Sequence, residues 1–422
     1  MLTSAVVGAL ACQVDSYLDT FETVVVSCKP VEFLPVKNGK KSKVIVPTED
    51  AAYEVEFKDT ILFPEGGGQP SDHGMILAGG KEIPVLAIRR ESLTALHKVQ
   101  TPLEPDTKVK MELDWKRRFD HMQQHSGQHL VSAILDQMEV PTLSWSLGEK
   151  MSYVEIPRKL TEEEVLSVED RCNNVISQGL DITVEVPDKD LVKKDKLPDD
   201  YDQERGILRV VHIGDLDANP CCGTHLKNTK EMNAISLLHQ VGIRGANSRL
   251  YFLIGDRVRA YAREMNTLTR SLNAKLSCQT EEIETKITKL DSQMRDSYKS
   301  EKQWMAEVAS LEAARIKTEL AECKKVYVYR PEQSTLVYFN MLMAELKLEP
   351  GSGVVVLACG TGKTGGALVV IGDNADKVAA EIRDAGVVKE LKGGGKGVKW
   401  QGKVMAWEKG EPETLSAFVS KL

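Results

Sequence analysis

The sequence predicts an α+β protein that is divided into several domains, and three observations lead to this prediction. The chain has 422 residues, more than one hydrophobic core of ordinary size usually holds. Its N-terminal part alternates apolar and polar residues with a period of two, which is typical of strands. Residues 256–325 contain neither proline nor glycine and repeat apolar residues at helical spacing. These changes of pattern divide the chain into four predicted segments, 1–113, 114–255, 256–325 and 326–422.

Residues 1–113 are expected to be β-rich. The stretches FETVVVSC, YEVEFKDTILF and TKVKMELDW alternate apolar and polar residues and are separated by Gly, Asp and Pro signals. Between two of the expected strands lies PEGGGQPSDHG, at 64–74. This segment is either a wide turn that needs several positive φ angles or a functional loop, and the residues alone leave the choice open.

Residues 114–255 are expected to combine helices and strands. The stretch RRFDHMQQHSGQHLVSAILDQM has helical periodicity. Thr161 with Glu164 three residues later is a capping box that opens a second amphipathic helix. Strands are expected in TLSWSLGEKMSYVEIP, DITVEVP, ILRVVHIG, AISLLHQVGI and SRLYFLIG.

The C-terminal half is expected to begin with a long helical element. The apolar spacing over 256–325 predicts a helical hairpin or coiled coil, which would act as a spacer or as an arm for a homodimer. Residues 326–422 are expected to form a small α/β domain, with strands KVYVYR, GVVVLACG and GALVVIGD before a helix.

Composition and charge exclude some classes of protein. No apolar run approaches the length of about 20 residues that a membrane span needs, and the N-terminal stretch lacks the basic region of a secretory signal. The eight cysteines are scattered without a disulfide framework, which favours reduced thiols and a cytoplasmic location. The formal net charge is −7, so any contact with nucleic acid must come from local basic patches.

The stretch HMQQHSGQHL places three histidines four residues apart, His121, His125 and His129. Residues four apart lie one above the other on a helix, so two neighbouring imidazoles can reach one cation. Zinc usually needs four ligands, and a second pair must therefore come from elsewhere.

The stretch NPCCGTHL at 219–226 offers that second pair. Cys221 stands four residues before His225, and Cys222 competes because it stands three before it. Imidazole nitrogens with one thiolate form a suitable tetrahedral set for zinc. The alternative is a structural histidine pair and a cysteine in a turn.

Two glycine-rich stretches near the C-terminus are candidates for phosphate binding. CGTGKTGG lacks a P-loop glycine, because Leu357 stands where it is required, and Gly365 and Gly366 would break the helix that should follow. KELKGGGKGVKWQGK is expected to be a loop in which lysines, Lys392 and Lys396 among them, bind phosphates and Trp400 stacks on a base. An unspecialised charged loop is the alternative.

Together these motifs resemble a known family. HSGQH followed by CCGTH resembles the His-x3-His and Cys-x3-His pairs of the editing domain of alanyl-tRNA synthetase, and of its free-standing relatives, the alanyl-tRNA editing (AlaX) family. LFPEGGGQPSDHG and LKGGGKG resemble glycine-rich segments of the same proteins. The order of parts is similar to the long eukaryotic free-standing form along essentially the whole chain. The resemblance implies an N-terminal β-barrel-like domain followed by a zinc-containing editing domain.

The resemblance also implies the metal ligands. The matching positions are His125, His129, Cys221 and His225, which would hold one zinc ion per chain. This set leaves out His121, and it leaves out Cys222, where the family has glycine or another non-thiol residue.

The activity that the resemblance implies is hydrolysis of the ester between a wrong amino acid and tRNA, which serves translation fidelity. Ser-tRNA(Ala) is the chief expected substrate, with Gly-tRNA(Ala) and Ser-tRNA(Thr) as further candidates. An aminoacyl ester is already activated, so water needs positioning more than a covalent nucleophile. The candidates for this task are His121, Gln128 and Thr224. A zinc closed by four protein ligands has no open position to generate hydroxide. It would either organise the pocket or take part in catalysis by exchanging a ligand, and the sequence leaves this choice open.

Selection of serine over alanine requires a group that hydrogen-bonds the serine hydroxyl. The resemblance implies a hydroxyl residue on the strand after the zinc helix, where TLSWSLG offers Thr142, Ser144 and Ser146, with Ser144 favoured by its spacing. Three loop residues are also candidates for substrate binding, namely Gly67, Gly68 and Gln69.

Two other classes of function compete. One is a non-catalytic tRNA-binding protein with a structural zinc. The other is a zinc hydrolase of other esters or amides, which the lack of a His-Glu-x-x-His motif disfavours.

Overall fold

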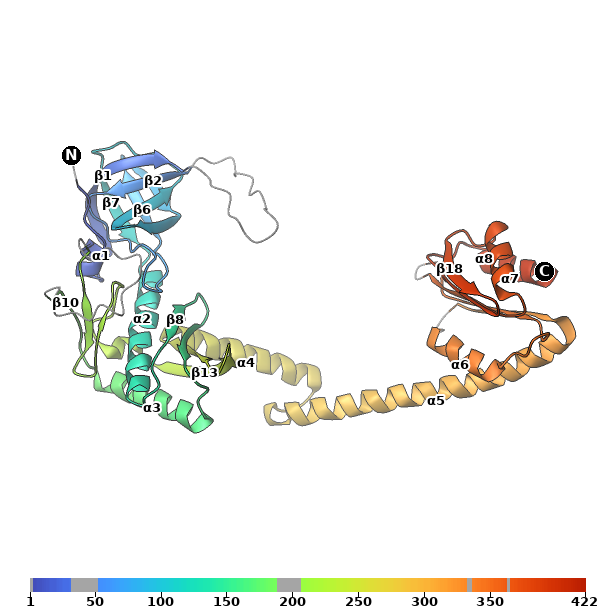
Figure 1. Cartoon of the computed structure of the whole chain (residues 1–422). Coiled ribbons are helices and arrows are strands. Elements are labelled where there is room, and N and C mark those ends of the chain that lie inside the picture. Colours follow the sequence, from blue (N-terminus) through green and yellow to red (C-terminus); the bar gives the residue numbers. More distant parts are fainter. Residues whose placement is uncertain (1–2, 32–51, 188–205, 332–335, 363–364) are drawn as a thin grey trace. The chain divides into compact units, whose positions relative to one another are not determined.

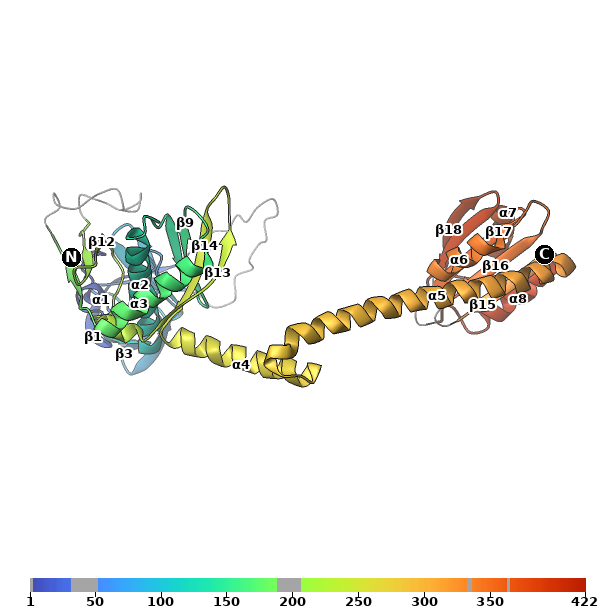
Figure 2. The same ribbon diagram turned by 90° about the horizontal axis from the view of Figure 1, so that it is seen from below.

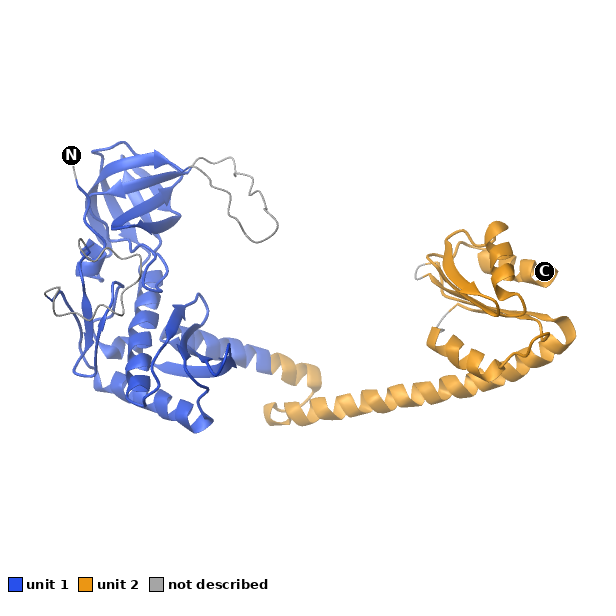
Figure 3. Cartoon of the chain, viewed as in Figure 1, with its two compact units in different colours: residues 1–269 blue, residues 270–422 orange. Residues whose placement is uncertain are grey.

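The computed structural model describes residues 3–31, 52–187, 206–331, 336–362 and 365–422. The chain is a mixed α+β protein, as expected, and falls into two compact units, Met1–Thr269 and Arg270–Leu422 (Figure 3). The boundary between the units falls inside the predicted segment 256–325, and the four-segment division stays a prediction. None of the helices in the described ranges is long and apolar enough to cross a membrane.

The first unit begins with a strongly curled antiparallel sheet (Figure 1). Its strand order is β4-β3-β7-β1-β2-β6-β5. The curl encloses a core of alternate strand residues, such as Val55, Ile76 and Met111. The strands are β1 Thr20–Pro30, β2 Tyr53–Phe57, β3 Gly74–Ala78, β4 Lys81–Val85, β5 Ala87–Glu91, β6 Thr94–Val99 and β7 Lys108–Leu113; the short helix α1 (Ala11–Val14) precedes them.

Two long helices and two smaller sheets complete this unit. Helix α2 (Trp115–Asp136) and helix α3 (Glu162–Gln178) pack with a four-stranded sheet of order β13-β14-β9-β8, and Figure 2 shows α3 beside its strands. A three-stranded sheet has the order β10-β11-β12. The strands are β8 Ser144–Leu147, β9 Ser152–Ile156, β10 Ile182–Glu185, β11 Val210–Ile213, β12 Asp217–Pro220, β13 Ile235–Gly242 and β14 Ser248–Ile254; the turn η3 is Thr229–Met232.

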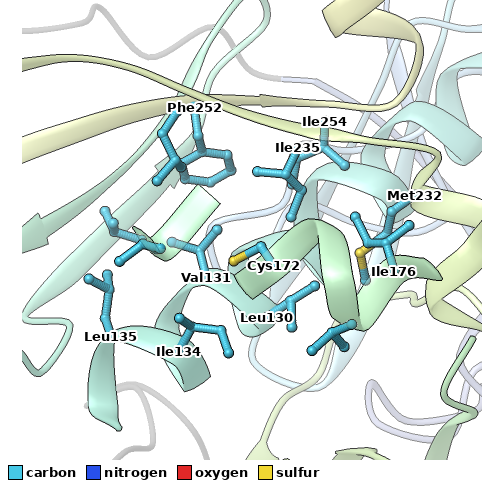
Figure 4. Close-up of a cluster of buried hydrophobic side chains, with 14 of the residues drawn as sticks. Leu130, Val131, Ile134, Leu135, Cys172, Ile176, Met232, Ile235, Phe252 and Ile254 are labelled. Atoms are coloured by element: carbon cyan, nitrogen blue, oxygen red, sulfur yellow. The ribbon is translucent and has the colours of Figure 1, made fainter. Parts of the chain in front are cut away.

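The ends of these helices follow from local sequence. Asp114 caps α2, since its carboxylate accepts a hydrogen bond from the backbone N–H of Arg117. The predicted capping box of Thr161 and Glu164 is present at the start of α3, and Gly179 ends that helix in the left-handed conformation, with φ 73°. The apolar face of α2 enters a core shared with α3 and β14 (Figure 4), which includes Leu130, Val131, Ile134, Cys172 and Phe252.

A fully buried ion pair joins the glycine-rich segment 64–74 to the start of α2. The guanidinium of Arg118 donates to the carboxylate of Asp72, and both side chains are completely buried. Arg118 also donates to the backbone oxygens of Ser16 and Ile61, at 2.9 and 2.6 Å. The backbone N–H of Phe63 donates to Asp72 at 2.6 Å. Because every charge here is paired and hydrogen-bonded, the desolvation of two ions is offset and the segment is fixed on α2.

Most of the stretch 256–325 is helical, as predicted, although its last residue, Lys325, already begins strand β15. Helix α4 (Asp256–Leu276) is followed by the turn η4 (Thr280–Glu282) and by the 41-residue helix α5 (Ile283–Cys323). In α5 only the last part is buried, where Ala309, Ala313, Ile316 and Leu320 face a core. A hairpin or coiled-coil arrangement and a homodimer through this arm remain predictions.

The second unit contains a five-stranded sheet of order β15-β16-β17-β19-β18. The first two strands are parallel and the other pairs are antiparallel. Helices α5 and α6 share a core with one face of the sheet, and α7 and α8 share a core with the other. The elements are β15 Lys325–Arg330, α6 Leu336–Leu346, β16 Val354–Cys359, β17 Gly366–Gly372, α7 Ala375–Asp384, β18 Leu391–Lys396, β19 Lys399–Val404 and α8 Glu411–Lys421.

The expected glycine- and lysine-rich loop is instead the hairpin β18–β19, and the expectation that Trp400 stacks on a base is wrong. Trp400 is only 5% exposed and lies in the core. A Cβ on Gly393 or Gly402 would lie 2.7 or 2.3 Å from its ring, so these glycines make room for the indole. The glycines therefore serve packing rather than loop formation.

The P-loop-like stretch joins two antiparallel strands, β16 and β17. No helix follows Gly366, where a P-loop would require one. Lys363 and Thr364 of this stretch lie outside the described residues. The described residues therefore agree with the rejection of a nucleotide triphosphate site.

We expect Asp72→Ala to lower the free energy of unfolding by about 3–5 kcal/mol, because it leaves the buried guanidinium of Arg118 without its counter-charge. Glu112→Ala is the control, since it breaks the exposed pair with Lys110 and should cost less than about 1 kcal/mol. Urea unfolding followed by circular dichroism measures both changes. Equal effects of the two substitutions would contradict the assigned role of the buried pair.

Candidate metal centre

The structure brings together the four predicted ligands from two distant parts of the sequence. His125 and His129 lie on α2, and Cys221 and His225 follow β12. One side-chain donor atom from each residue lies within 4.8 Å of all the others. The sulfur of Cys221 is 3.3 Å from Nε2 of His125 and 3.3 Å from Nε2 of His225. The four donors thus surround one point, as tetrahedral coordination requires.

Each half of the cluster is placed by its own local structure. On α2, one helical turn separates His125 from His129, and their ring centroids are 5.3 Å apart. On the other side, Arg209 holds the turn after β12, because its backbone oxygen accepts from Cys221 and its guanidinium donates to the backbone oxygen of Gly223. A Cβ on Gly223 would lie 2.3 Å from the ring of His125. Only glycine lets this turn approach α2 so closely.

The second nitrogen of each histidine meets a polar neighbour. Nδ1 of His125 is 2.9 Å from Oε1 of Gln69. Nδ1 of His225 is 3.4 Å from the hydroxyl of Ser126, and Nδ1 of His129 is 3.5 Å from a carboxylate oxygen of Asp217. Contacts of this kind fix the ring orientation and direct Nε2 toward a metal.

The donor set fits a metal ion. Nε2 of His129 is buried and has no hydrogen-bond partner among the described residues, which is costly unless another group, such as a metal ion, interacts with it. Three imidazole nitrogens and one sulfur, all close to one point, are typical ligands of zinc. The residues His125, His129, Cys221 and His225 could therefore hold one metal ion.

The charges of the cluster also suit a cation. Burial alone would raise the pKa of Cys221, but the neighbouring imidazoles, His125 and His225 first, lower it well below its ordinary value. Burial lowers the pKa of His225 to about 3. Burial likewise lowers the pKa of His129, but Asp217 and Cys221 outweigh it and raise that pKa to about 9. A bound cation would replace the proton of His129 as counter-charge of the thiolate, so binding should release protons.

His121 and Cys222 lie outside the four-residue group. His121 is buried one turn before His125, and burial together with the charge of Arg117 lowers its pKa to about 4. Burial raises the pKa of Cys222 to about 11, so it stays a thiol at neutral pH. Its sulfur lies against the glycine-rich segment, 3.1 Å from where a Cβ on Gly67 would be.

The glycine-rich segment 64–74 is part of the centre. Gly67 and Gly68 have φ angles of 58° and 77°, so the turn does need left-handed residues. Gln69 follows them and is completely buried. Its Oε1 accepts a hydrogen bond from the backbone N–H of Thr224 at 3.0 Å and lies against His125, while its Nε2 donates to the hydroxyl of Thr224 at 2.8 Å. Gln69 and Thr224, two candidates from the sequence, are thus hydrogen-bonded to one another, and Gln69 also contacts the ligand His125.

A chain of hydrogen-bonded side chains continues along α2 beyond the metal ligands. Nε2 of Gln128 donates to the hydroxyl of Ser132 at 2.9 Å, which is 2.8 Å from the hydroxyl of Thr142. Oε1 of Gln128 is buried and has no hydrogen-bond partner in the part of the chain that the structure describes. Ser144 instead donates to Glu155 at 3.2 Å, and strand alternation puts Ser146 on the same face of β8 as Ser144. The structure therefore connects Thr142, rather than Ser144, with the ligand helix.

Sequence reasoning missed several residues of the centre. Ser126, which lies beside His225, stands next to a ligand within HSGQH and could have been weighed. Asp217 and Arg118 carry no recognisable motif, because their partners are far away in the sequence. Lys392 and Lys396 belong to the second unit, where both are exposed on β18.

Comparisons with known proteins identify the family. The chain is 37% identical to the putative alanyl-tRNA editing protein alaX of Saccharomyces cerevisiae, over 99% of this chain and 98% of the relative. The chain belongs to the alanyl-tRNA editing protein family. It is also 35% identical to alanyl-tRNA editing protein Aarsd1-B of Xenopus laevis, over 94% and 93% of the two chains. The family membership that the sequence motifs predicted is therefore confirmed.

Two further matches of this editing-family chain are partial. The alanyl-tRNA editing protein AlaX-L of Pyrococcus horikoshii is 32% identical over 46% of this chain and 50% of its own. The model of the threonyl and alanyl tRNA synthetase second additional domain matches residues 208–251. That range includes Cys221 and His225, whereas the two histidines of α2 precede it.

Metal analysis of purified variants tests the donor set. We expect about one ion per chain in the unchanged protein and little or none in Cys221→Ala, because the sulfur is the single anionic donor. Cys222→Ser should retain the metal, since its sulfur faces Gly67. Inductively coupled plasma mass spectrometry gives the stoichiometry. Full metal content in Cys221→Ala, or loss in Cys222→Ser alone, would show that the donor set is different.

Gln69→Ala should weaken metal binding about 10–100-fold, because it removes the hydrogen-bond partner of His125. Competition with a chromophoric chelator measures the affinity. Gln240→Ala is a matched control, since the side-chain amide of Gln240 exchanges hydrogen bonds with the backbone of Leu160, which is not part of the donor cluster. An unchanged affinity in Gln69→Ala would mean that the glycine-rich segment does not position the ligand.

Proposed function

We propose that the chain is a zinc-dependent deacylase that hydrolyses mischarged tRNA in trans, chiefly Ser-tRNA(Ala), with Gly-tRNA(Ala) and Ser-tRNA(Thr) as further substrates. The observation that carries the proposal is the four-donor cluster of His125, His129, Cys221 and His225, in a chain of the alanyl-tRNA editing family. A cytoplasmic location agrees with this role and stays a prediction.

The main task of the protein in this reaction is to position the water and the ester. The ester of an aminoacyl-tRNA is already activated, so a water molecule must be held beside its carbonyl carbon. When bound, zinc supplies a positive charge that polarises or orients a group of the substrate. The chain offers the buried, partnerless Oε1 of Gln128 to accept a hydrogen bond from water. Burial lowers the pKa of His121 to about 4, so its imidazole is a weak base that is neutral near pH 7 and can accept a hydrogen bond from water. The hydroxyl of Thr224 is a further water-positioning candidate.

Recognition of serine would fall to a hydroxyl of the stretch 142–146. The contact of Thr142 with Ser132 on the ligand helix favours Thr142, while Ser144 and Ser146 are the other proposed groups. A group that hydrogen-bonds the serine hydroxyl rejects alanine, because its own polar atom would be left unpaired.

The partner is proposed to be the tRNA itself, and the hairpin β18–β19 supports this. In its register Lys392 faces Lys403 and Lys396 faces Lys399, so four exposed lysines share one face. Like charges directly opposite are destabilising in a sheet. A phosphate backbone would relieve this repulsion and bind the face.

A non-catalytic tRNA-binding protein with a structural zinc is the second candidate. It is favoured by the same lysine face and by a donor set that fills all four positions of a tetrahedral ion. Binding of mischarged tRNA without turnover would distinguish it.

Deacylation assays test the proposal directly. We expect release of serine from Ser-tRNA(Ala), little release of alanine from Ala-tRNA(Ala), and a loss of at least about 100-fold in kcat/KM for His125→Ala, since the cluster loses a donor. Glycine- and serine-charged tRNAs of both the alanine and the threonine acceptors establish the preference. Lys377→Ala, an exposed site on α7, is the control. Undiminished activity in His125→Ala would refute the site.

A further inference from the structure

Trp145 is a large aromatic side chain that is only partly buried and is not a metal ligand. It lies on β8, the edge strand of the four-stranded sheet, and is 40% exposed. Its strand partner Val154 and its neighbour on the same face, Leu147, are buried in the core. Leu143, on the same side by strand alternation, is also exposed. The indole therefore stands at the border of the core with much of its surface in solvent.

The glycine-rich segment holds this indole in one orientation. Nε1 of Trp145 donates a hydrogen bond to the backbone oxygen of Gly67 at 3.4 Å. A Cβ on Gly68 would lie 2.8 Å from that nitrogen and 3.1 Å from Cδ1 of the ring. The absence of a side chain at Gly68 thus lets the backbone lie directly against one edge of the indole, while the rest of the ring stays uncovered.

The same three residues connect the indole to the metal centre. A Cβ on Gly67 would lie 3.1 Å from the sulfur of Cys222, which is the neighbour of a ligand, and a Cβ on Gly68 would lie 2.8 Å from Trp145. Oε1 of Gln69 lies 2.9 Å from Nδ1 of His125. Because consecutive residues span only about 3.5 Å each, Trp145 lies within a few residue lengths of the donor cluster, at a position that we call its rim.

We propose that Trp145 binds the 3′-terminal adenosine of the tRNA by stacking on its base. This inference rests on the proposed function. The ester to be cleaved is on the terminal ribose, and the base is attached to that same ribose. An ester held at the cluster therefore brings the base to the rim. An exposed indole is a good stacking surface for a base, and such stacking contributes about 1–3 kcal/mol per base.

Stacking would also contribute to rate, because a base fixed at the rim limits the positions of the ester at the centre. The role differs from that of Gln69, which contacts a ligand. Trp145 contacts the substrate, so its loss should leave the metal in place.

The test measures binding of uncharged RNA minihelices by fluorescence anisotropy, so that it does not depend on hydrolysis. One minihelix ends in CCA and the other has an abasic terminal nucleotide. Trp145→Ala should weaken binding of the first about 10-fold or more, and Trp145→Phe should retain most of the affinity. Trp304→Ala, an exposed tryptophan on α5, is the matched control.

The double-mutant cycle decides between stacking and a structural role. If Trp145 stacks on the base, its removal and removal of the base should together weaken binding no more than either change alone. Additive losses, unchanged binding in Trp145→Ala, or a loss of metal in that variant would overturn the proposal. Absence of minihelix binding by the unchanged protein would overturn it as well.

Deacylation by the same variants separates this inference from the proposed function. Trp145→Ala should raise KM for Ser-tRNA(Ala) about 10-fold or more, with a smaller change in kcat. If the unchanged protein binds the CCA end with the expected coupling but releases no serine, the proposed deacylase function fails and the stacking site stands. If it releases serine without that coupling, the stacking site fails alone.

Discussion

The buried ion pair of Asp72 and Arg118 is the interaction on which the rest of the first unit depends. Arg118 stands seven residues, about two helical turns, before the ligand His125 on α2. Asp72 stands three residues after Gln69, which contacts that ligand. The pair therefore fixes the glycine-rich segment along the same helix that carries the metal ligands. Two buried charges would be costly alone, but Arg118 also reaches two backbone oxygens, so its donors are used.

Close backbone approach is the second constraint at the centre. Three surfaces meet there: α2, the turn after β12 and the segment 64–74. At Gly223 and Gly68 a Cβ would collide with His125 and with Trp145. These glycines therefore let the surfaces come close enough for His125 and Cys221 to meet at one point, while the histidine Nδ1 atoms keep polar neighbours.

The hairpin β18–β19 shows how one strand pair serves two purposes. On its inner face, Trp400 packs over Gly393 and Gly402. On its outer face, lysines stand opposite lysines in the register, among them Lys392 and Lys403. The inner face stabilises the second unit, whereas the outer face concentrates positive charge on a chain whose net charge is −7. Such concentration is a property of the register and does not appear in the composition.

The sequence by itself determined the α+β class, the main helical stretches, the capping box of Thr161 and Glu164, and the spacing of the ligand pairs, because these depend on periodicity and on neighbours within one turn. It could not choose between Cys221 and Cys222 without the family resemblance, since both spacings allow a ligand. Tertiary structure decided which donor atoms meet, that Gln69 supports a ligand, that Trp400 is buried and that Trp145 is exposed. These features depend on contacts between residues far apart in the chain, such as Gln69 with Thr224, and no local pattern encodes such contacts.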